Sequence, residues 1–307
     1  MSDSIESNDD SSNGLRSGYI AIVGRPNVGK STLLNYILGM KLSITSRKPQ
    51  TTRHQILGVK TTDNVQAIYV DTPGIHQRRG TAINKYMNRA ATSILNDVDV
   101  ILFLVQAKQW TEEDQAIIEK LKLVSCPVVL VVNKMDTLDN KKELLPLIEG
   151  LSSKLEFSEI IPASALNGVN VEVLEKKISS LLPASTHFYP EDQITDRSMR
   201  FLASEIIREK LIRELGQELP YTSTVVIDKY DEDESIVRIH ATIYVESTGQ
   251  KAIIIGKKGA RLKSIGTKAR EDISVLVDSK VYLNLWVKVR EGWSNDEQAL
   301  RGLGYGE

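Results

Sequence analysis

The 307-residue sequence lacks several features that would each place it in a special class. Its one cysteine, Cys126, excludes an internal disulfide and favours a reducing compartment. The four histidines are scattered and show no Cys/His spacing typical of zinc. No stretch is apolar over the roughly 20 residues that a membrane-spanning helix needs. What remains, 41% hydrophobic and 26% charged residues, is typical of a globular protein of two domains.

Excess charge of one sign is also missing, because the formal net charge is −1. The positive charge is nevertheless local: Gly249 to Arg290 contains ten basic and three acidic residues. Such a basic segment favours contact with a phosphate backbone. The N-terminus from Met1 to Asn13 is rich in Ser, Asp and Glu and does not resemble a signal peptide. We expect a disordered acidic tail over residues 1–16.

Residues 17–183 alternate short apolar runs with amphipathic segments, which predicts strands and helices in turn. The runs are nearly continuous in Ile, Val and Leu, as in strands covered on both faces. The pattern predicts an α/β domain with a mostly parallel sheet, helices on both faces and ligands at the carboxyl ends of the strands. We predict strands at 19–23, 65–70, 100–105, 128–132 and 160–161, and helices at 30–38, 81–96, 112–123, 141–154 and 171–182.

A segment without any period follows and separates a second domain. Pro183 to Thr195 contains two prolines and several polar residues, so we assign a linker over residues 184–196. Residues 197–307 then follow the order helix, strand, strand, helix, helix, strand, with an acidic turn at 231–234 between the two strands. This order predicts an α+β domain.

A phosphate loop is the first motif that indicates chemistry. It matches G-x-x-x-x-G-K-[ST] between a predicted strand and a predicted helix. Its glycines let backbone N–H groups approach phosphates, Lys30 neutralises the β- and γ-phosphates, and Ser31 binds Mg²⁺. The alternative is a chance match in a Gly-containing turn. The nucleotide-binding run is Gly24-Arg25-Pro26-Asn27-Val28-Gly29-Lys30-Ser31, with Thr32 after it.

Three further motifs follow predicted strands. Asp71 can reach Mg²⁺ through a water, and Gly74 can donate its N–H to the γ-phosphate. Asp136 can accept hydrogen bonds from N1–H and the 2-amino group of guanine, which adenine lacks, whereas its alternative role is a helix N-cap. Four motifs in order predict a GTP and GDP site that uses Mg²⁺. Besides the phosphate loop, the motifs are Asp71-Thr72-Pro73-Gly74 with Ile75 next, Asn133-Lys134-Met135-Asp136 and Ala163-Ser164-Ala165.

With these motifs the N-terminal half resembles a translation-factor-related GTPase domain of the Era type. The resemblance implies that the segment 46–54 is the first switch, in which Thr52 rather than Thr51 ligates Mg²⁺ beside Ser31 and Asp71. It implies that Lys30, Thr52 and Gly74 serve catalysis. Ile75 stands where Ras-type GTPases carry a glutamine, so we expect a low intrinsic rate. In related GTPases an asparagine like Asn27 helps to bind K⁺, and we expect K⁺ to stimulate hydrolysis.

The C-terminal domain carries a Gly-x-x-Gly loop that resembles that of a type II KH domain. Lys257 and Lys258 between its glycines suit phosphates, and we expect a groove for single-stranded bases lined by Ile253, Ile254 and Ile265. The alternative is a basic, solvated helix after a turn. The predicted RNA-binding residues are Gly256, Lys257, Lys258, Gly259, Arg261 and Lys263.

The resemblance also implies a biological role. Era-type proteins bind 16S ribosomal RNA near its 3′ end, act in assembly of the 30S subunit, and associate peripherally with the inner membrane. We therefore expect a cytoplasmic monomer with peripheral membrane contact. One alternative is an RNA-binding module in which GTP is mainly structural. Another, a tRNA-modifying GTPase, would need a cysteine near the C-terminus, which the sequence lacks.

Overall fold

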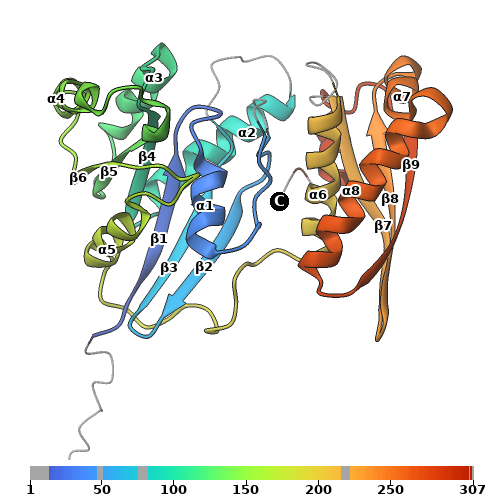
Figure 1. Ribbon diagram of the computed structural model, residues 1–307, viewed down its shortest axis with the longest axis horizontal. Coiled ribbons are helices and arrows are strands. Elements are labelled where there is room, and N and C mark those ends of the chain that lie inside the picture. The colour runs from blue at the N-terminus through green and yellow to red at the C-terminus, as the bar shows by residue number, and fades with distance from the viewer. Residues whose placement is uncertain (1–13, 47–50, 75–81, 216–221, 304, 306–307) are drawn as a thin grey trace, which may run out of the picture.

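The structure, a computed structural model, describes residues 14–46, 51–74, 82–215, 222–303 and 305. Two domains lie side by side, the N-terminal one in blue to green and the C-terminal one in orange to red (Figure 1). Most of the expected acidic tail falls outside the described residues, but Arg16 already begins the first strand, so the tail ends before residue 16. Among the described residues, no helix is both long and apolar enough to cross a bilayer.

The N-terminal domain is built on a six-stranded sheet with the order β2-β3-β1-β4-β5-β6. Strand β2 is antiparallel to β3, and all other neighbouring pairs are parallel. This confirms the mostly parallel sheet predicted from the buried apolar runs. The strands are β1 Arg16–Val23, β2 Ile56–Thr62, β3 Val65–Asp71, β4 Val100–Gln106, β5 Val128–Asn133 and β6 Glu159–Pro162.

Helices cover both faces of this sheet. On one face α1 and α5 pack in a buried cluster with Ile22 and Leu102, and on the other α2, α3 and α4 pack in a cluster with Ala21 and Phe103. Successive residues of a strand point to opposite faces, so the central strands are apolar throughout. The helices are α1 Lys30–Leu38, α2 Ala82–Ser93, α3 Glu112–Leu121, α4 Leu144–Ser152 and α5 Val171–Leu181.

Two features of this domain differ from the predicted elements. The apolar runs do not predict β2, because Gly58, Lys60 and Thr61 interrupt its apolar residues. At the edge of the sheet a strand is covered less completely, so it needs fewer apolar residues. In addition, the predicted helix at 141–154 begins as a 3₁₀ turn, Lys141–Glu143, before α4.

The segment assigned as a linker is bound along the edge of the sheet. The backbone N–H of Val59 donates to the carbonyl of Ile194 at 2.7 Å. The side-chain oxygen of Gln66 accepts from the N–H groups of Phe188 at 2.7 Å and Tyr189 at 2.9 Å. The connection therefore follows the N-terminal domain closely before it enters the second domain.

The C-terminal domain is an α+β unit with the strand order β7-β8-β9. Strand β7 is antiparallel to β8, and β9 is parallel to β8. The acidic residues expected in a turn extend β7 to Asp233, so the turn is shorter than predicted. The elements are α6 Met199–Glu214, β7 Ser223–Asp233, β8 Ile236–Val245, α7 Thr248–Ile255, α8 Ala260–Leu276, β9 Lys280–Val289 and α9 Glu297–Gly302.

A small hydrophobic cluster joins the two domains near the C-terminus. It links α2 of the first domain to the loop after β9, to α9 and to Tyr305. The ring of Tyr305 also stacks on His54, with centroids 4.6 Å apart. The buried members are Ile83, Trp293, Ala299, Leu300 and Tyr305. The sequence pattern does not predict α9 or this contact.

Candidate functional site

The loop between β1 and α1 forms a tight backbone turn at the carboxyl end of the sheet. Gly24 has φ 151° and Gly29 has φ 108°, conformations that side chains rarely adopt. A Cβ at Gly29 would lie 2.3 Å from the amide nitrogen of Asn133, and one at Gly24 would lie 2.5 Å from the carbonyl oxygen of Leu104. Both glycines are therefore required by position, and backbone N–H groups are left to line the cavity.

Lys30 is held inside this loop. Its ammonium donates to the carbonyl oxygens of Gly24 at 3.0 Å and Arg25 at 3.2 Å. Burial lowers the pKa of Lys30 to about 8, although nearby Asp71 opposes the shift. A phosphate oxygen at this position would restore the preference for the charged form. The loop is thus arranged to receive an anion.

Two hydroxyls bond to the carboxylate of Asp71 at the end of β3, and a third lies beside them. Ser31 Oγ lies 2.7 Å from Asp71 Oδ2 and 3.0 Å from Thr52 Oγ1, and Ser43 Oγ donates to the same Asp71 oxygen at 2.7 Å. The other oxygen, Asp71 Oδ1, is buried and has no hydrogen-bond partner among the described residues. Burial raises the pKa of this carboxyl because it disfavours the charged form, and a divalent cation would stabilise that charged form.

This corner fits Mg²⁺ bound together with a nucleotide. Such Mg²⁺ takes few protein ligands, keeps waters and binds phosphate oxygens, so hydroxyls and one carboxylate suffice. Thr52 lies in the corner, whereas the Thr51 hydroxyl pairs with Ser46 at 2.9 Å. The structure therefore brings together Ser31, Thr52 and Asp71, the residues predicted to hold Mg²⁺.

The residues after β5 join the phosphate loop to the loop after β6. The amide of Asn133 donates to the Val28 carbonyl at 2.8 Å and accepts from the Ala165 N–H at 2.9 Å. Ser164 Oγ donates to Asp136 Oδ1 at 2.5 Å, which fixes the orientation of that carboxylate. Asn133 thus holds the loops, and Asp136 is positioned to bind a base edge.

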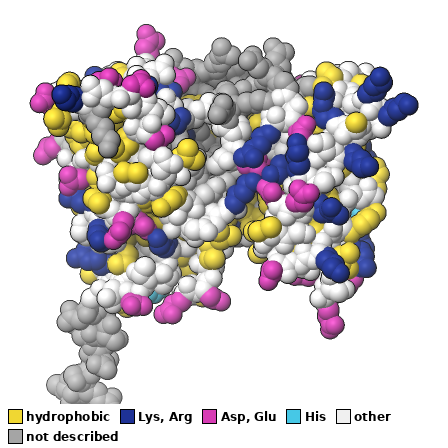
Figure 2. All heavy atoms as spheres, in the orientation of Figure 1, with side chains coloured by type: hydrophobic (Ala, Val, Ile, Leu, Met, Phe, Trp, Pro, Cys, Tyr) yellow, Lys and Arg dark blue, Asp and Glu magenta, His cyan; other side chains and the backbone are white. Residues whose placement is uncertain are grey.

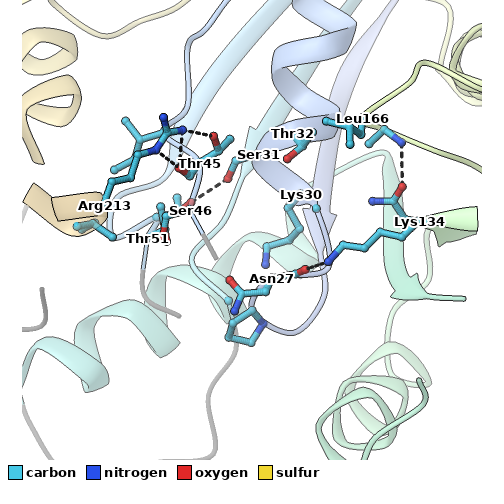
Figure 3. Close-up of a pocket in the computed structure, with 18 of the residues that line it drawn as sticks. Asn27, Lys30, Ser31, Thr32, Thr45, Ser46, Thr51, Lys134, Leu166 and Arg213 are labelled. Atoms are coloured by element: carbon cyan, nitrogen blue, oxygen red, sulfur yellow. Dashed lines mark hydrogen bonds between the residues drawn. The ribbon is translucent and has the colours of Figure 1, made fainter. Parts of the chain in front are cut away.

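These groups line one cavity of about 910 Å³ that is shared by both domains. Figure 3 shows Asn27 and Lys30 in the loop, Lys134 on one side, and Thr45, Ser46 and Arg213 on the other. The Lys134 ammonium donates to the Asn27 carbonyl at 2.6 Å. Arg213 belongs to α6, so the C-terminal domain contributes to the wall of the nucleotide cavity.

The other predicted nucleotide-site residues lie in or beside this loop system. Pro26 packs against Gly74, where a Cβ would lie 2.9 Å from its ring, and Thr72 donates to the Ile22 carbonyl at 3.0 Å. The Met135 N–H donates to the Ala163 carbonyl at 3.1 Å. Thr32 lines the cavity, and Pro73 lies between Thr72 and Gly74 in the loop after β3. Ile75 and residues 47–50 of the switch lie outside the described residues.

Some residues of the site were not predicted from the motifs. Arg25 forms a buried ion pair with Asp114 of α3 at 3.0 Å, which fixes the loop from the side. Ser43 adds a hydroxyl at Asp71, although no motif marks it. Arg213 reaches the cavity from the other domain, and only the folded chain shows this approach.

The first-switch segment is held by α6 of the C-terminal domain. The Arg208 guanidinium donates to the Thr51 carbonyl while it pairs with buried Glu205. Arg213 Nη2 donates to the Thr45 carbonyl at 3.1 Å. The backbone on both sides of residues 47–50 is therefore bound by arginines of one helix.

A buried carboxylate of the same helix completes this contact. Glu209 accepts from the Thr45 N–H at 3.0 Å, from Lys41 at 2.5 Å and from Arg213 at 3.0 Å. Burial alone would raise the pKa of Glu209, but these hydrogen bonds outweigh it and hold the pKa below its ordinary value. Near the end of the segment, Arg53 donates to the Tyr305 hydroxyl at 3.0 Å.

The Gly-x-x-Gly loop lies between α7 and α8, and both of its glycines have a positive φ. Gly256 has φ 72° and Gly259 has φ 79°, and a Cβ at Gly256 would lie 2.8 Å from the Cβ of Arg261. Lys257 and Lys258 are exposed, as is Lys263 on α8. Figure 2 shows Lys and Arg side chains gathered over the α7 and α8 part of this domain.

The expected apolar groove needs a correction. Ile254 and Ile265 are fully buried in the core of the C-terminal domain, so they cannot contact a base. Only Ile253, which is 45% exposed, faces outward. On α7 neighbouring residues point in different directions, so one of two adjacent isoleucines packs inward while the other remains at the surface.

Comparisons with known proteins agree with this geometry. A family model described as 50S ribosome-binding GTPase matches residues 19–134, and a KH domain model matches residues 218–294. GTPase Era of Pseudomonas aeruginosa is 60% identical over 97% of this chain and 98% of its own length. GTPase Era of Ectopseudomonas mendocina is 60% identical over 94% of this chain and 97% of its own length.

The chain belongs to the Era family of GTPases.

Two solved structures match the whole Era-family architecture. A point variant of Aquifex aeolicus Era bound to GDP and AlF4⁻ has a TM-score of 0.92 at 41% identity, and the match covers 95% of this chain and all of that one. An Era complex with MgGDPNP and nucleotides 1506–1542 of 16S ribosomal RNA has a TM-score of 0.92 at 42% identity, with the same coverage. The predicted fold is thereby confirmed, and the chain is a GTPase.

Proposed function

We propose that this Era-family GTPase is a switch that binds 16S ribosomal RNA near its 3′ end and acts in assembly of the small ribosomal subunit. The observation that carries the proposal is the nucleotide cavity whose wall includes residues of α6 in the RNA-binding domain. A purely structural nucleotide would not need a wall supplied by the other domain.

The nucleotide half of the proposal assigns a role to each cavity residue. Lys30 exchanges the carbonyls of Gly24 and Arg25 for oxygens of the β- and γ-phosphates. Ser31, Thr52 and, through water, Asp71 hold Mg²⁺, which neutralises charge on these phosphates when bound. These side chains orient the γ-phosphate for attack by water.

The base is selected by the carboxylate of Asp136. Ser164 occupies one of its oxygens, and the second oxygen can accept from guanine, while Lys134 lies along the cavity toward Asn27. Adenine presents no matching donors and would leave the second oxygen of this carboxylate without a partner, which is costly in a partly buried site. The cavity therefore favours GTP and GDP.

Ras-type enzymes use a glutamine directly after the Asp-x-x-Gly motif to place the attacking water, and this chain has Ile75 at that position. The backbone N–H of Gly74 beside Pro26 and a K⁺ ion held by Asn27 are the proposed substitutes. The intrinsic rate is accordingly low, and it rises in KCl relative to NaCl. The same rate in both salts would remove Asn27 from this role.

The RNA half rests on the Gly-x-x-Gly loop with its two exposed lysines and on Ile253 beside it. KH loops of this kind clamp about four nucleotides of backbone. The description of the GTPase family model names the 50S ribosome. The solved Era complex, by contrast, contains 16S ribosomal RNA and has the same two domains as this chain. The second comparison covers the RNA-binding domain as well, so it favours the small subunit and a site of action in the cytoplasm.

The two halves are coupled in this proposal through the first switch. Thr52 lies 3.0 Å from Ser31 while Arg208 holds the carbonyl of the adjacent Thr51. GTP, through Mg²⁺ and Thr52, therefore stabilises the same backbone that α6 binds. Linkage then requires that GTP and the docked RNA-binding domain favour each other.

GTP hydrolysis with and without RNA of nucleotides 1506–1542 tests this function. We expect low turnover by the chain alone and an increase of about tenfold with the RNA. A variant with Lys257→Glu and Lys258→Glu should keep the basal rate and lose the increase, because repulsion from phosphates replaces attraction. The matched control, Lys176→Glu with Lys177→Glu on α5, reverses the same charge far from the loop and should keep the increase.

A rate that RNA does not change, with RNA binding intact, would contradict the switch. It would favour the alternative in which GTP is mainly a structural ligand of an RNA-binding module. Peripheral contact with the inner membrane, which the family resemblance implies, stays a prediction.

A further inference from the structure

The three-stranded sheet of the C-terminal domain has one face away from the helices. Alternate residues of β8 are buried in the core against α6 and α8: Val237, Ile239, Ala241, Ile243 and Val245. The residues between them point to the opposite face, together with their parallel partners on β9. We call this the outer face, and its members on the two strands are Arg238, His240, Thr242, Tyr244, Lys280, Tyr282, Asn284, Trp286 and Lys288.

A row of three aromatic rings crosses the outer face. The His240 ring stacks on Trp286, with centroids 5.4 Å apart and planes at 15°, and its centroid lies 6.1 Å from that of Tyr282. Tyr282 is 49% exposed and Trp286 is 42% exposed. Cross-strand pairing alone accounts for aromatic residues in strands. Cross-strand pairing does not explain why the large rings of Tyr282 and Trp286 are half exposed to water, because polar side chains could form cross-strand pairs at these positions equally well.

The charge around this row favours an anionic partner along β9. Lys280 and Lys288 stand on the same face of β9, and neither forms an ion pair with any described residue. Carboxylates also lie on β7, at the far edge of the sheet. Asp231 and Asp233 are paired with Lys229 and Arg238, and Asp228 accepts a hydrogen bond from Thr242 at 2.7 Å. The two lysines of β9 are therefore available to an anionic partner, whereas each of these carboxylates already has a polar partner.

The outer face also adjoins the proposed RNA groove. Strand β9 is the edge strand of the sheet, and α7, which leads into the Gly-x-x-Gly loop, packs against it. A chain that leaves the loop and crosses the edge of β9 arrives at Tyr282 and Trp286. Aromatic rings beside lysines on a sheet are a recurrent platform on which unpaired bases stack.

We propose that the outer face, through Tyr282, His240 and Trp286, is a second RNA contact that stacks unpaired bases of the strand leaving the Gly-x-x-Gly groove. The inference rests on the proposed RNA-binding function and adds a site to it. Lys280 and Lys288 bind the phosphates of the stacked nucleotides. The four or so nucleotides of a KH clamp would thus be extended by two or three stacked bases.

Binding to two RNA lengths tests the second contact. The long probe is RNA of nucleotides 1506–1542, and the short probes are overlapping pieces of about five nucleotides from it, which fill the groove alone. Tyr282→Ala with Trp286→Ala should weaken binding of the long RNA by about tenfold or more and leave the best short piece unchanged. Trp286→Phe, which keeps a stacking ring, should bind the long RNA nearly as the unchanged chain does.

Tryptophan fluorescence of the unchanged chain gives an independent measurement of base stacking on the outer face. Bases stacked on Trp286 should quench part of the tryptophan emission when the long RNA is added. The Trp286→Phe variant retains Trp110 and Trp293 and should lose that quenching. Lys288→Glu, a surface change on the same face, should weaken binding of the long RNA several-fold without altering any aromatic ring.

The possible failures are distinguishable. If the double alanine variant bound the long RNA normally while Lys257→Glu with Lys258→Glu lost it, the outer face would be excluded and the KH function would stand. Normal RNA binding together with lost binding to purified 30S subunits would assign the face to a protein and overturn the stacking proposal. If the unchanged chain bound neither RNA, the proposed function itself would fail.

Discussion

At the scale of single residues, the backbone of the phosphate loop is determined by the space that neighbouring groups occupy. Gly29 must be glycine since the amide of Asn133 occupies the space of a side chain. Lys30 and Ser31 begin α1, so the loop fixes their direction. The motifs do not predict which side chain each motif residue contacts, such as Asp114 for Arg25 or Ser43 for Asp71. Those partners come from other elements and depend on the fold.

Asp136 carries the first prediction at this scale. Asp136→Asn should weaken GTP binding by about 100-fold or more and move the preference toward xanthine nucleotides, because the amide donates where guanine also donates. Titration with GTP and XTP measures both effects. Asp139→Asn is the matched control, since this exposed carboxylate pairs only with Lys108 on the surface. Unchanged GTP affinity in Asp136→Asn would show that the base lies elsewhere.

His54 carries a prediction on pH. Burial lowers its pKa to about 4, although Glu205 opposes this, and nearby Arg208, Arg197 and Arg53 lower it further. The folded state therefore keeps His54 neutral, while the unfolded chain takes up a proton below about pH 6.5. Its contribution is complete above pH 7, and roughly 2–3 kcal/mol of unfolding free energy is lost as the pH falls toward 4.

Denaturant unfolding at several pH values checks this prediction. The slope between pH 6.5 and 4 should be smaller in His54→Gln than in the unchanged chain, because the glutamine takes up no proton. The comparison of slopes isolates His54 from the carboxylates, which titrate in both chains. Equal slopes would mean that His54 is charged in the folded protein.

At the scale of elements, strands β1, β4 and β5 and helix α1 follow from sequence because their apolar periods are complete. Strand β2 does not, since an edge strand needs fewer apolar residues. Helix α6 was predicted only as the first element of the second domain. The structure buries both sides, because α6 lies between the sheet of its own domain and the first switch.

The buried polar side of α6 explains why its role was missed. Glu205, Arg208 and Glu209 are charged residues that a single sequence places in water, yet each is buried in an ion pair. Burial of such groups requires partners, and here Thr51 of the first switch and Thr45 just before it supply further ones. Chain length and the aperiodic segment predicted two domains, but the contact between them is visible only in the folded chain.

At the scale of the whole molecule, the first switch lies between the two domains and belongs to both. In the proposed function GTP acts on it through Thr52, and RNA acts on it through the C-terminal domain, whose α6 and Tyr305 contact the segment. Two ligands that stabilise one segment must help each other's binding by the same factor. Coupling of this kind is typically about 5- to 150-fold in affinity. The account therefore depends on a measurable ratio.

That ratio is the affinity for RNA of nucleotides 1506–1542 with a non-hydrolysable GTP analogue divided by the affinity with GDP. We predict at least about a fivefold preference for the GTP analogue in the unchanged chain. Arg213→Ala should bring the ratio close to one, because the Thr45 carbonyl loses its donor. Arg200→Ala, which removes a contact to Ile227 within the RNA-binding domain on the same helix, should preserve the preference. Equal RNA affinity with both nucleotides in the unchanged chain would contradict the coupling.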